Sequence, residues 1–339
     1  LFVPVIDKNQ KPLMPTKPSR ARRWIKEGKA TPFWKRGIFC VRLNVEPSAL
    51  NLDEIVVGID PGSKKEGYTV KSKLHTYLNL QADAVTHVKD AVEARRNMRR
   101  GRRFRKTPCR KNKRNRLGRG MPPSTKARWQ WKLRICNWLK KLFPVTSFIV
   151  EDIKAKTKGQ RRWDMSFSPL EVGKKWFYDE LSKLGTLTTK QGYETKELRD
   201  LVGLKKSKAK MSDRFDAHCV DSWVLCNSVV GGHVLPDNEK LIKIIPLIFH
   251  RRQLHAFQPA KKGVRRPYGS TRSLGLTRGS LVKHKKHGLS YVGGTYKGRI
   301  SLHGFDGVRL TQSAKVTDCK FLTYNTWRIV NTSPRPEIR

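Results

Sequence analysis

An apolar run at residues 55–59 ends in a carboxylate and opens the stretch around which the chain is organised. Its residues are nearly all β-branched, which predicts a strand buried on both faces of a sheet. Asp60 ends the run, and Pro61 and Gly62 turn the chain after it. A carboxylate at the end of a buried strand is held rigidly and still reaches solvent, so it suits a metal ligand. A turn-forming aspartate without chemical function is the alternative interpretation of this stretch alone.

Two later segments predict further acidic elements. Residues 146–152, TSFIVED, predict a second buried strand that ends in Glu151. A buried helix is predicted from about Asp213, and on it His218 and Asp221 lie three residues apart and share one face. For His218 alone, a histidine satisfied within the core is the more common interpretation. Two buried strands that both end in carboxylates are less expected by chance than one.

The order of the elements predicts an α/β fold. Two more strands follow Asp60, at residues 67–71 and 74–81, joined by tight turns. Three consecutive antiparallel strands with an acidic end on the first are typical of the ribonuclease H fold. They are equally typical of the sugar-kinase and actin ATPases, in which an Asp-x-Gly-Ser segment holds a phosphate, and this stretch alone does not separate the two.

Smaller units are predicted on either side of this core. The first 50 residues predict two strands and, between them, a short helix from Arg20 to Glu27 that Ser19 can cap. Residues 241–249 predict an apolar strand, and Pro246 within it favours a position at the edge of a sheet. Short strands separated by glycine turns after residue 279 predict a small, basic, mainly-β domain.

Composition and charge narrow the possible partners. The chain of 339 residues carries 73 Lys plus Arg against 27 Asp plus Glu, a formal net charge of +46. Self-repulsion of this size opposes a compact state, so a polyanionic partner is expected, and nucleic acid is the obvious one. A membrane partner is not expected, because no apolar run approaches about 20 residues and no signal-peptide pattern opens the sequence. The six Cys form no C-x-x-C pair, which disfavours a zinc site and a disulfide scaffold and fits a reducing, cytoplasmic compartment.

One internal segment is almost purely basic. Residues 95–119 contain eleven Arg, three Lys and no acidic residue, and a helix is predicted through about Lys106, ended by Pro108. A helix that is basic on all sides suits repeated phosphate contacts, although a disordered basic tail has the same composition. Basic and aromatic residues after residue 250 are candidates for RNA backbone contact and base stacking. The residues that we expect to bind nucleic acid are Arg20, Arg22, Arg23, Arg95, Arg96, Arg99, Arg100, Arg102, Arg103, Arg105, Arg110, Arg251, Arg252, Arg265, Arg266 and Tyr268.

The candidate catalytic and metal-binding set comprises Asp60, Glu151, His218 and Asp221. Carboxylate oxygens favour Mg²⁺ or Mn²⁺, and two such ions roughly 4 Å apart can activate a water and stabilise the leaving 3′ oxygen in phosphodiester cleavage. We expect Asp60 to bridge both ions, Glu151 to hold one and Asp221 the other. His218 is expected to ligate a metal or to act as a general base.

Several motifs, in their order along the chain, resemble the IscB family of transposon-encoded, RNA-guided nucleases, which are relatives of the CRISPR type II effectors. The PLMP-like segment is LMPTKPSRARRWIKEGKA, and the three split RuvC-like segments are VVGIDPGS, FIVEDI and DAHCVD. An arginine-rich bridge helix follows the first RuvC-like segment. The catalytic residues of the family correspond here to Asp60, Glu151, His218 and Asp221. IscB proteins also carry an HNH nuclease, which needs histidines, between the second and third RuvC segments. The interval here is short and contains no histidine between Asp152 and Ser212, so the chain resembles the HNH-lacking sister group, IsrB.

The resemblance implies a split RuvC-like core of ribonuclease H fold and a nickase that cuts the non-target strand of double-stranded DNA under the direction of an omega RNA. Guide pairing would supply the sequence specificity, while the protein holds the heteroduplex and reads a short flanking motif. A monomeric ribonucleoprotein, associated with the nucleoid when on DNA, is implied. The implied domains are a PLMP module (1–52), RuvC-I (53–86), the bridge helix (87–122), RuvC-II and RuvC-III (123–232) and a C-terminal domain that binds RNA and the flanking motif (233–339).

Three other functions remain open at this point. A TnpB-like nuclease is also RuvC-only and RNA-guided, but it carries a C-x-x-C zinc ribbon that this sequence lacks. A non-catalytic RNA-binding protein with a degenerate ribonuclease H fold would not need a complete acidic set. A dimeric junction-resolving nuclease without RNA would leave the basic helix and the flanking units unexplained.

Overall fold

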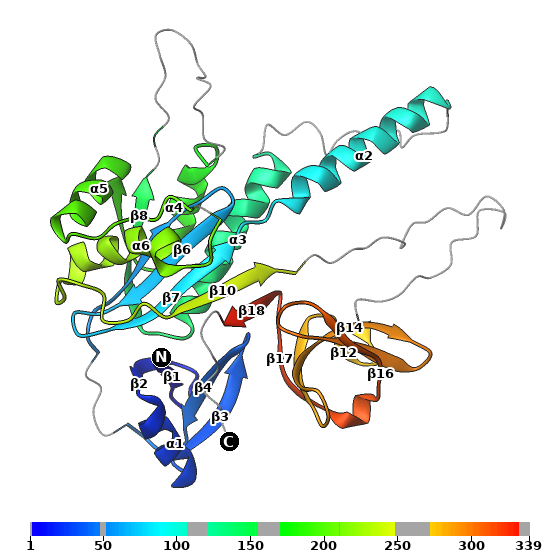
Figure 1. The fold of residues 1–339 in the computed structure, drawn as a ribbon, viewed down its shortest axis with the longest axis horizontal. Helices are drawn as coiled ribbons and strands as arrows, with labels where there is room; N and C mark the ends of the chain where they lie inside the picture. Colours follow the sequence, from blue (N-terminus) through cyan, green and yellow to red (C-terminus); the bar gives the residue numbers. More distant parts are fainter. Residues whose placement is uncertain are drawn as a thin grey trace.

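The computed structural model describes residues 2–47, 52–106, 121–152, 154, 170–209, 211–247 and 272–331. These residues form a mixed α/β architecture, which confirms the α/β class predicted from the sequence (Figure 1). Their strands assemble into sheets of four, seven and five strands and one two-stranded ribbon. Among the described helices, none combines the length and the apolar character that crossing a membrane requires.

The N-terminal unit contains the four-stranded sheet, in the order β2-β1-β4-β3. Its elements are β1 (Val3–Ile6), β2 (Pro12–Thr16), α1 (Pro18–Lys26), β3 (Ala30–Lys35) and β4 (Ile38–Leu43). The helix packs on the sheet through buried Ala21 and half-buried Trp24. The predicted cap at Ser19 is wrong, because α1 begins at Pro18 with Lys17 as its N-cap. Proline suits this first helical position, since its ring fixes φ and it has no N–H to leave unpaired.

The central sheet has seven strands in the order β18-β10-β7-β6-β5-β8-β9. They are β5 (Ile55–Asp60), β6 (Lys65–Lys71), β7 (Thr76–Asp83), β8 (Val145–Asp152), β9 (Thr186–Gln191), β10 (Leu241–Pro246) and β18 (Trp327–Asn331). Strands β5, β6 and β7 form an antiparallel meander, as predicted. Strand β8 pairs in parallel with β5, and β9 pairs in parallel with β8. The two predicted acidic strands are therefore direct neighbours.

Helices cover both faces of the central sheet. They are α3 (Pro123–Lys140) and α4 (Lys174–Ser182) on one face and α6 (Phe215–Val230) on the other, with α5 (Gly192–Leu201) packed on α6. Successive side chains of β5 pack against the helices on opposite faces of the sheet. Val57 lies in the core with α3 and α4, whereas Val56 packs on Leu225 and Cys226 of α6. This accounts for the continuous apolar run before Asp60.

The arginine-rich helix α2 (His87–Phe104) follows β7 and projects away from the central sheet (Figure 1). Its described arginines are exposed, and even Phe104 is 90% exposed. At its start, half-buried Val88 packs against the core of the central sheet. Only its first turns therefore have apolar packing, as expected for a helix that is basic on all sides.

Two strands from the last hundred residues complete the central sheet. Strand β10 runs parallel to β7, and β18 pairs with it in antiparallel orientation on the outside. The predicted edge position of β10 is therefore wrong. Pro246, which motivated that prediction, is the last residue of the strand, where its missing N–H interrupts little of the ladder. The proposed unit 233–339 thus supplies strands to two different sheets.

The remaining C-terminal strands form the five-stranded antiparallel sheet, in the order β16-β15-β14-β13-β17. The elements of this part are β11 (Arg272–Ser273), β12 (Leu276–Thr277), β13 (Ser280–His284), β14 (Gly288–Tyr296), β15 (Arg299–His303), β16 (Arg309–Ala314), a 3-10 turn (Val316–Asp318) and β17 (Cys319–Tyr324). Their small core contains Val282, Val292 and Leu302. This agrees with the short strands and glycine turns that the sequence predicts.

The tip of the β3–β4 hairpin joins all three sheets. The Arg36 backbone N–H donates to Thr323 Oγ1 of β17 at 3.2 Å, and its guanidinium lies 5.2 Å from the Trp327 ring centroid of β18. Gly37 has φ +94°, and a Cβ there would lie 2.8 Å from Ile329 Cδ1, so only glycine fits this close approach. Lys35 Nζ donates to a carbonyl at the end of α3. The N-terminal unit is thereby packed against the end of the chain.

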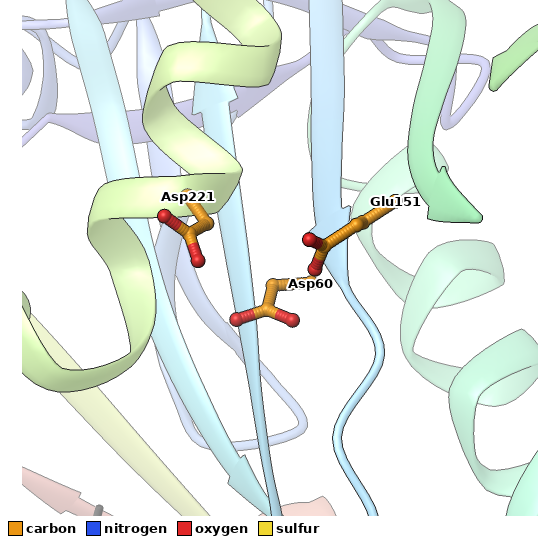
Figure 2. Close-up of side chains that lie close together, drawn as sticks. All are labelled: Asp60, Glu151 and Asp221. Atoms are coloured by element: carbon orange, nitrogen blue, oxygen red, sulfur yellow. The ribbon is translucent and has the colours of Figure 1, made fainter. Parts of the chain in front are cut away.

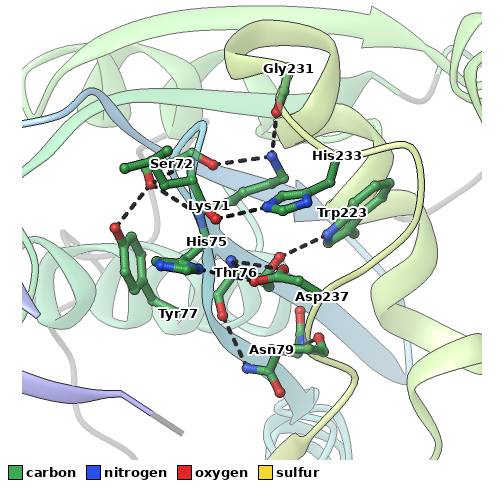
Figure 3. A network of polar contacts seen from close by, with 12 residues as sticks. Lys71, Ser72, His75, Thr76, Tyr77, Asn79, Trp223, Gly231, His233 and Asp237 are labelled. Atoms are coloured by element: carbon green, nitrogen blue, oxygen red, sulfur yellow. Dashed lines mark hydrogen bonds and ion pairs between the residues drawn. The ribbon is translucent and has the colours of Figure 1, made fainter. Parts of the chain in front are cut away.

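A polar network fixes the chain that follows α6 onto the β6–β7 hairpin (Figure 3). The buried Lys71 ammonium donates to the carbonyls of Ser72 and Gly231. Asp237 accepts hydrogen bonds from the Thr76 backbone N–H at 3.0 and 3.2 Å. Thr76 Oγ1 in turn accepts from the indole N–H of Trp223 on α6 at 3.0 Å. Because this network holds the C-terminal half of α6 against the sheet, it restrains the helix that carries Asp221.

Candidate metal centre

Three of the four predicted site residues converge at one end of the central sheet. Asp60 ends β5, Glu151 lies near the end of β8, and Asp221 is in the middle of α6 (Figure 2). One carboxylate oxygen from each lies within 4.8 Å of the other two. Because Ile59 and Val150 are paired in the parallel β5–β8 register, the next residue on each strand brings its carboxylate to the same edge. This cluster could hold a metal ion.

Glycines in the sheet allow α6 to come close enough for Asp221 to join the strand carboxylates. A Cβ on Gly58 would lie 2.0 Å from the Ser222 carbonyl oxygen, and one on Gly67 would lie 1.8 Å from that of His218. Contacts this short do not occur between real atoms, so any larger residue would push the helix away. The close approach of helix and sheet is therefore built into β5 and β6.

Two basic side chains contact the carboxylates. Arg199 Nη1, from the last turn of α5, lies 2.6 Å from Asp221 Oδ1. Lys206, between α5 and α6, contacts Asp221 Oδ2 and also lies 3.1 Å from Asp60 Oδ2. Burial lowers the pKa of the Lys206 ammonium, but the two carboxylates together raise it above its usual value. Neither cation was predicted, because nothing in the local sequence distinguishes them among 73 Lys and Arg.

Glu151 has a strongly perturbed carboxyl group. Burial and the neighbouring carboxylates of Asp60 and Asp221 raise its pKa to about 8. A carboxyl group with this environment carries a proton near neutral pH in the absence of another cation. Three oxygen donors with mutual repulsion fit a divalent cation, whose charge would replace the proton on Glu151.

His218 lies one turn before Asp221 on α6 and is 8% exposed. It does not belong to the group of three carboxylates whose oxygens lie close together. Its backbone carbonyl forms the close contact over Gly67 described above. Its predicted role as a ligand or general base stays a prediction.

Asp152, next to Glu151, supports the edge of the sheet from the opposite side of the strand. Its carboxylate accepts hydrogen bonds from Lys174 Nζ at 2.9 Å, Tyr178 Oη at 3.0 Å and Gln191 Nε2 at 2.8 Å. Burial raises the pKa of Asp152, but these hydrogen bonds together lower it. Successive side chains of a strand point to opposite faces, so the two neighbouring acids cannot both reach the site. This alternation is the sequence signal that separates Asp152 from Glu151.

A buried ion pair lies beneath the turn that follows Asp60. Lys132 of α3 contacts Glu66 of β6, and both side chains are fully buried. The Lys132 ammonium also donates to the Gly62 carbonyl at 3.3 Å, and the Tyr68 hydroxyl donates to Glu66 at 2.6 Å. Burial raises the pKa of Glu66 despite the lysine beside it. The pair ties α3 to the turn, so it helps to fix the position of Asp60.

The predicted nucleic-acid contacts lie on two helices where the structure describes them. Arg20, Arg22 and Arg23 are exposed on α1, and Arg102 lies within α2. The other predicted arginines of α2 are exposed, and they are Arg95, Arg96, Arg99, Arg100 and Arg103, with Arg105 at the C-cap. Outside the described residues are Arg110, Arg251, Arg252, Arg265, Arg266 and Tyr268.

Comparisons with known proteins give a family match over part of the chain and similarities to solved structures. The model of a family described as "RRXRR protein" matches residues 3–163. No curated protein matches the chain. The chain is similar to a solved structure described as T. thermophilus RuvC in complex with Holliday junction substrate, with 12% identity and a TM-score of 0.28, over 53% of this chain and 97% of that one. Because this TM-score is far below 0.5, the similarity supports no conclusion about this chain.

Proposed function

We propose that the chain is a metal-dependent, RuvC-like nuclease that nicks the non-target strand of a DNA target selected by a bound omega RNA. The observation that carries this proposal is the carboxylate cluster of Asp60, Glu151 and Asp221 at one end of the central sheet. Clustered carboxylates are the ligands used by two-metal phosphodiester hydrolysis.

The strand order supports a ribonuclease H-like core. The segment β7-β6-β5-β8-β9 consists of an antiparallel meander followed by two parallel strands, which is the arrangement expected of that fold. Strand order alone does not separate this core from the sugar-kinase and actin ATPases, but a second acid on β8 and a third on α6 are not needed to hold a phosphate. The observed acids therefore favour a nuclease over an ATPase.

The side chains of the site would divide the chemistry between them. Bound Mg²⁺ or Mn²⁺ would lower the pKa of the attacking water and stabilise charge on the leaving oxygen. In Figure 2 Asp60 lies between Asp221 and Glu151, so it would contact both ions, while Glu151 and Asp221 would each hold one. Arg199 would orient the Asp221 carboxylate through its 2.6 Å contact. His218 is proposed as an additional ligand or general base.

The basic helices support a nucleic-acid partner. Helix α2 presents its described arginines to solvent, and no carboxylate among the described residues forms an ion pair with them. The family match at residues 3–163 spans the N-terminal unit, both acidic strands and α2 between them, and this family is found in IscB- and IsrB-like proteins. These features favour an RNA-guided nickase over a junction-resolving enzyme that acts without RNA.

The experiment is to purify the chain with its co-expressed RNA, sequence that RNA, and supply supercoiled plasmid carrying the matching target with Mg²⁺. We expect conversion to the open-circular form by a nick confined to the non-target strand. Asp60→Asn should lower the rate by more than about a hundredfold, since it removes a ligand charge at the centre of the cluster. Asp200→Asn, an exposed acid on α5, is the matched control and should nick normally.

Two results would contradict the proposal. Cleavage of both strands at matched positions would contradict a nickase that uses the one carboxylate cluster found among the described residues. Stable RNA binding without any metal-dependent nicking would favour the non-catalytic RNA-binding function instead.

A further inference from the structure

Lys206 occupies an unusual place for a lysine in a metal-binding site. Its ammonium contacts one oxygen of Asp60 and one of Asp221, which come from different elements of the cluster. It therefore lies in the region between two proposed metal ligands, where a divalent cation bound by both would also lie. Two positive charges cannot share this region, because their repulsion is large at such distances.

The backbone on both sides of Lys206 is anchored to the helical layer. Leu204, two residues before Lys206, packs against an apolar cluster that includes Phe215 of α6, and its N–H donates to the Arg199 carbonyl at 3.1 Å. The following residue, Ser207, donates its N–H to the Asp216 carbonyl at 2.9 Å. These contacts fix where the side chain starts, so its direction into the cluster is a consequence of the fold.

The Lys206 side chain nevertheless has room to leave. It is 32% exposed, whereas the side chains of Asp60 and Asp221 are 14% and 4% exposed. A lysine has four rotatable bonds, so the ammonium can move into solvent while the anchored backbone stays in place. The carboxylates, held on a strand end and a helix, have no comparable freedom.

We propose that Lys206 is an internal counter-ion that competes with the divalent cation for Asp60 and Asp221, and so sets the metal concentration at which the site becomes loaded. This inference rests on the proposed function only in taking the cluster as a metal site. When an internal group occupies the site, the apparent affinity for the cation is the intrinsic affinity multiplied by the fraction of molecules in which the site is free. If the ammonium occupies the site in about 90% of molecules, apparent metal affinity falls about tenfold.

Lys206 and Arg199 have different roles at the cluster. The Arg199 guanidinium contacts Asp221 Oδ1, whereas Lys206 contacts the other oxygen of that carboxylate, Oδ2. Arg199 can stay in place when Oδ2 binds a cation, so its role is to orient Asp221. Lys206 contacts an oxygen of Asp60 and an oxygen of Asp221 at once, so it has to move before one cation can bind both carboxylates.

The test measures Mn²⁺ binding to the full chain with its bound RNA, after removal of metal with EDTA, from the electron paramagnetic resonance signal of free Mn²⁺. The Asp60→Asn variant gives the background from RNA and other sites. We expect Lys206→Ala and Lys206→Gln to bind Mn²⁺ at the site about three- to tenfold more tightly than the wild type. Lys208→Ala, which removes the same charge from an exposed position two residues away, should change the affinity less than about twofold.

Thermal unfolding gives a second readout that does not depend on activity. In EDTA, Lys206→Ala should melt below the wild type, because Asp60 and Asp221 lose a counter-ion. Saturating Mn²⁺ should then raise its melting temperature by more than it raises that of the wild type. Circular dichroism before heating checks that the variant is folded, and Lys206→Gln provides a variant that keeps most of the side-chain length.

Three outcomes would overturn the inference. Equal or weaker Mn²⁺ binding by the folded Lys206 variants would show that the ammonium does not compete. An equal gain in the Lys208 control would show only a general effect of net charge. If the wild type takes up no more Mn²⁺ than Asp60→Asn, the inference and the proposed metal site fail together, whereas normal uptake with unchanged Lys206 variants overturns the inference alone.

Discussion

The surroundings of Glu151 in the carboxylate cluster disfavour its charged form. Burial and the two neighbouring acids raise its pKa to about 8, whereas an ordinary glutamate has a pKa of 4.5. The native protein therefore keeps a proton on Glu151 that the unfolded chain releases. The stabilising contribution of this proton is fully present below about pH 4.5 and is lost as the pH rises through about 8.

Replacing Glu151 with glutamine removes this titration while keeping the shape of the side chain. In EDTA, we expect the stability of Glu151→Gln relative to the wild type to rise by about 1–3 kcal/mol between pH 5 and pH 9, because only in the wild type does unfolding release the Glu151 proton over this range. Urea unfolding followed by tryptophan fluorescence at several pH values measures the difference. A difference that does not change with pH would contradict the assigned environment of Glu151.

The sequence predicts the acids of the site better than its cations, and the reason lies in their surroundings. Asp60 and Glu151 each end an apolar run, and Asp221 lies on an apolar helix, so each carboxylate stands out from its neighbours. Arg199 and Lys206 lie in segments where basic residues are common, and their position depends on how α5 and α6 pack. That packing is a tertiary property, which no local pattern reveals.

At the level of elements, the contact between α6 and the β5–β6 pair decides whether the site forms. The helix backbone lies directly over Gly58 and Gly67, and no side chain separates them. Both strands and the helix were predicted from their apolar patterns. The close contact between helix and sheet was not predicted from the glycines, because a glycine within a strand can have several structural causes.

Adding one methyl group at Gly67 tests this contact. Gly67→Ala should displace α6, lower the stability by about 2–4 kcal/mol, and weaken Mn²⁺ binding because Asp221 moves away from Asp60. The matched control is Gly101→Ala on α2, where a Cβ meets nothing within 4 Å. The control should be neutral or slightly stabilising, since alanine favours a helix over glycine by about 1 kcal/mol. Normal Mn²⁺ binding by Gly67→Ala would refute this account of how the site is assembled.

At the scale of the whole molecule, the end of the described chain returns to the central sheet. Strand β18 pairs with β10, and its Trp327 is fully buried, with ring centroids 5.6 Å from Trp131 and 5.1 Å from Trp138. The stacking of Arg36 on the same ring adds the N-terminal unit to this junction. The sequence assigned Arg36, Trp131 and Trp327 to three separate units, since contacts between residues this far apart in the chain leave no local trace.

Trp327→Ala should therefore destabilise more than the C-terminal strand. We expect a loss of about 3–5 kcal/mol, the usual cost of removing a buried tryptophan, together with faster proteolysis of the N-terminal unit. Tyr296→Ala, at a side chain that is 57% exposed, is the control and should cost less than about 1 kcal/mol. A small effect of Trp327→Ala on both readouts would show that the three sheets are stabilised independently.

The central claim is that Asp60, Glu151 and Asp221 form a divalent-metal site, and diffraction from crystals soaked in Mn²⁺ tests it most directly. Anomalous difference maps locate Mn²⁺ without reference to activity or to the guide RNA. The account predicts Mn²⁺ density between these three carboxylates, with the Lys206 ammonium moved away from Asp60 and Asp221, and no such density in Asp60→Asn crystals. Ordered Mn²⁺ elsewhere in the chain, with none between the three carboxylates and Lys206 still contacting Asp60 and Asp221, would contradict it.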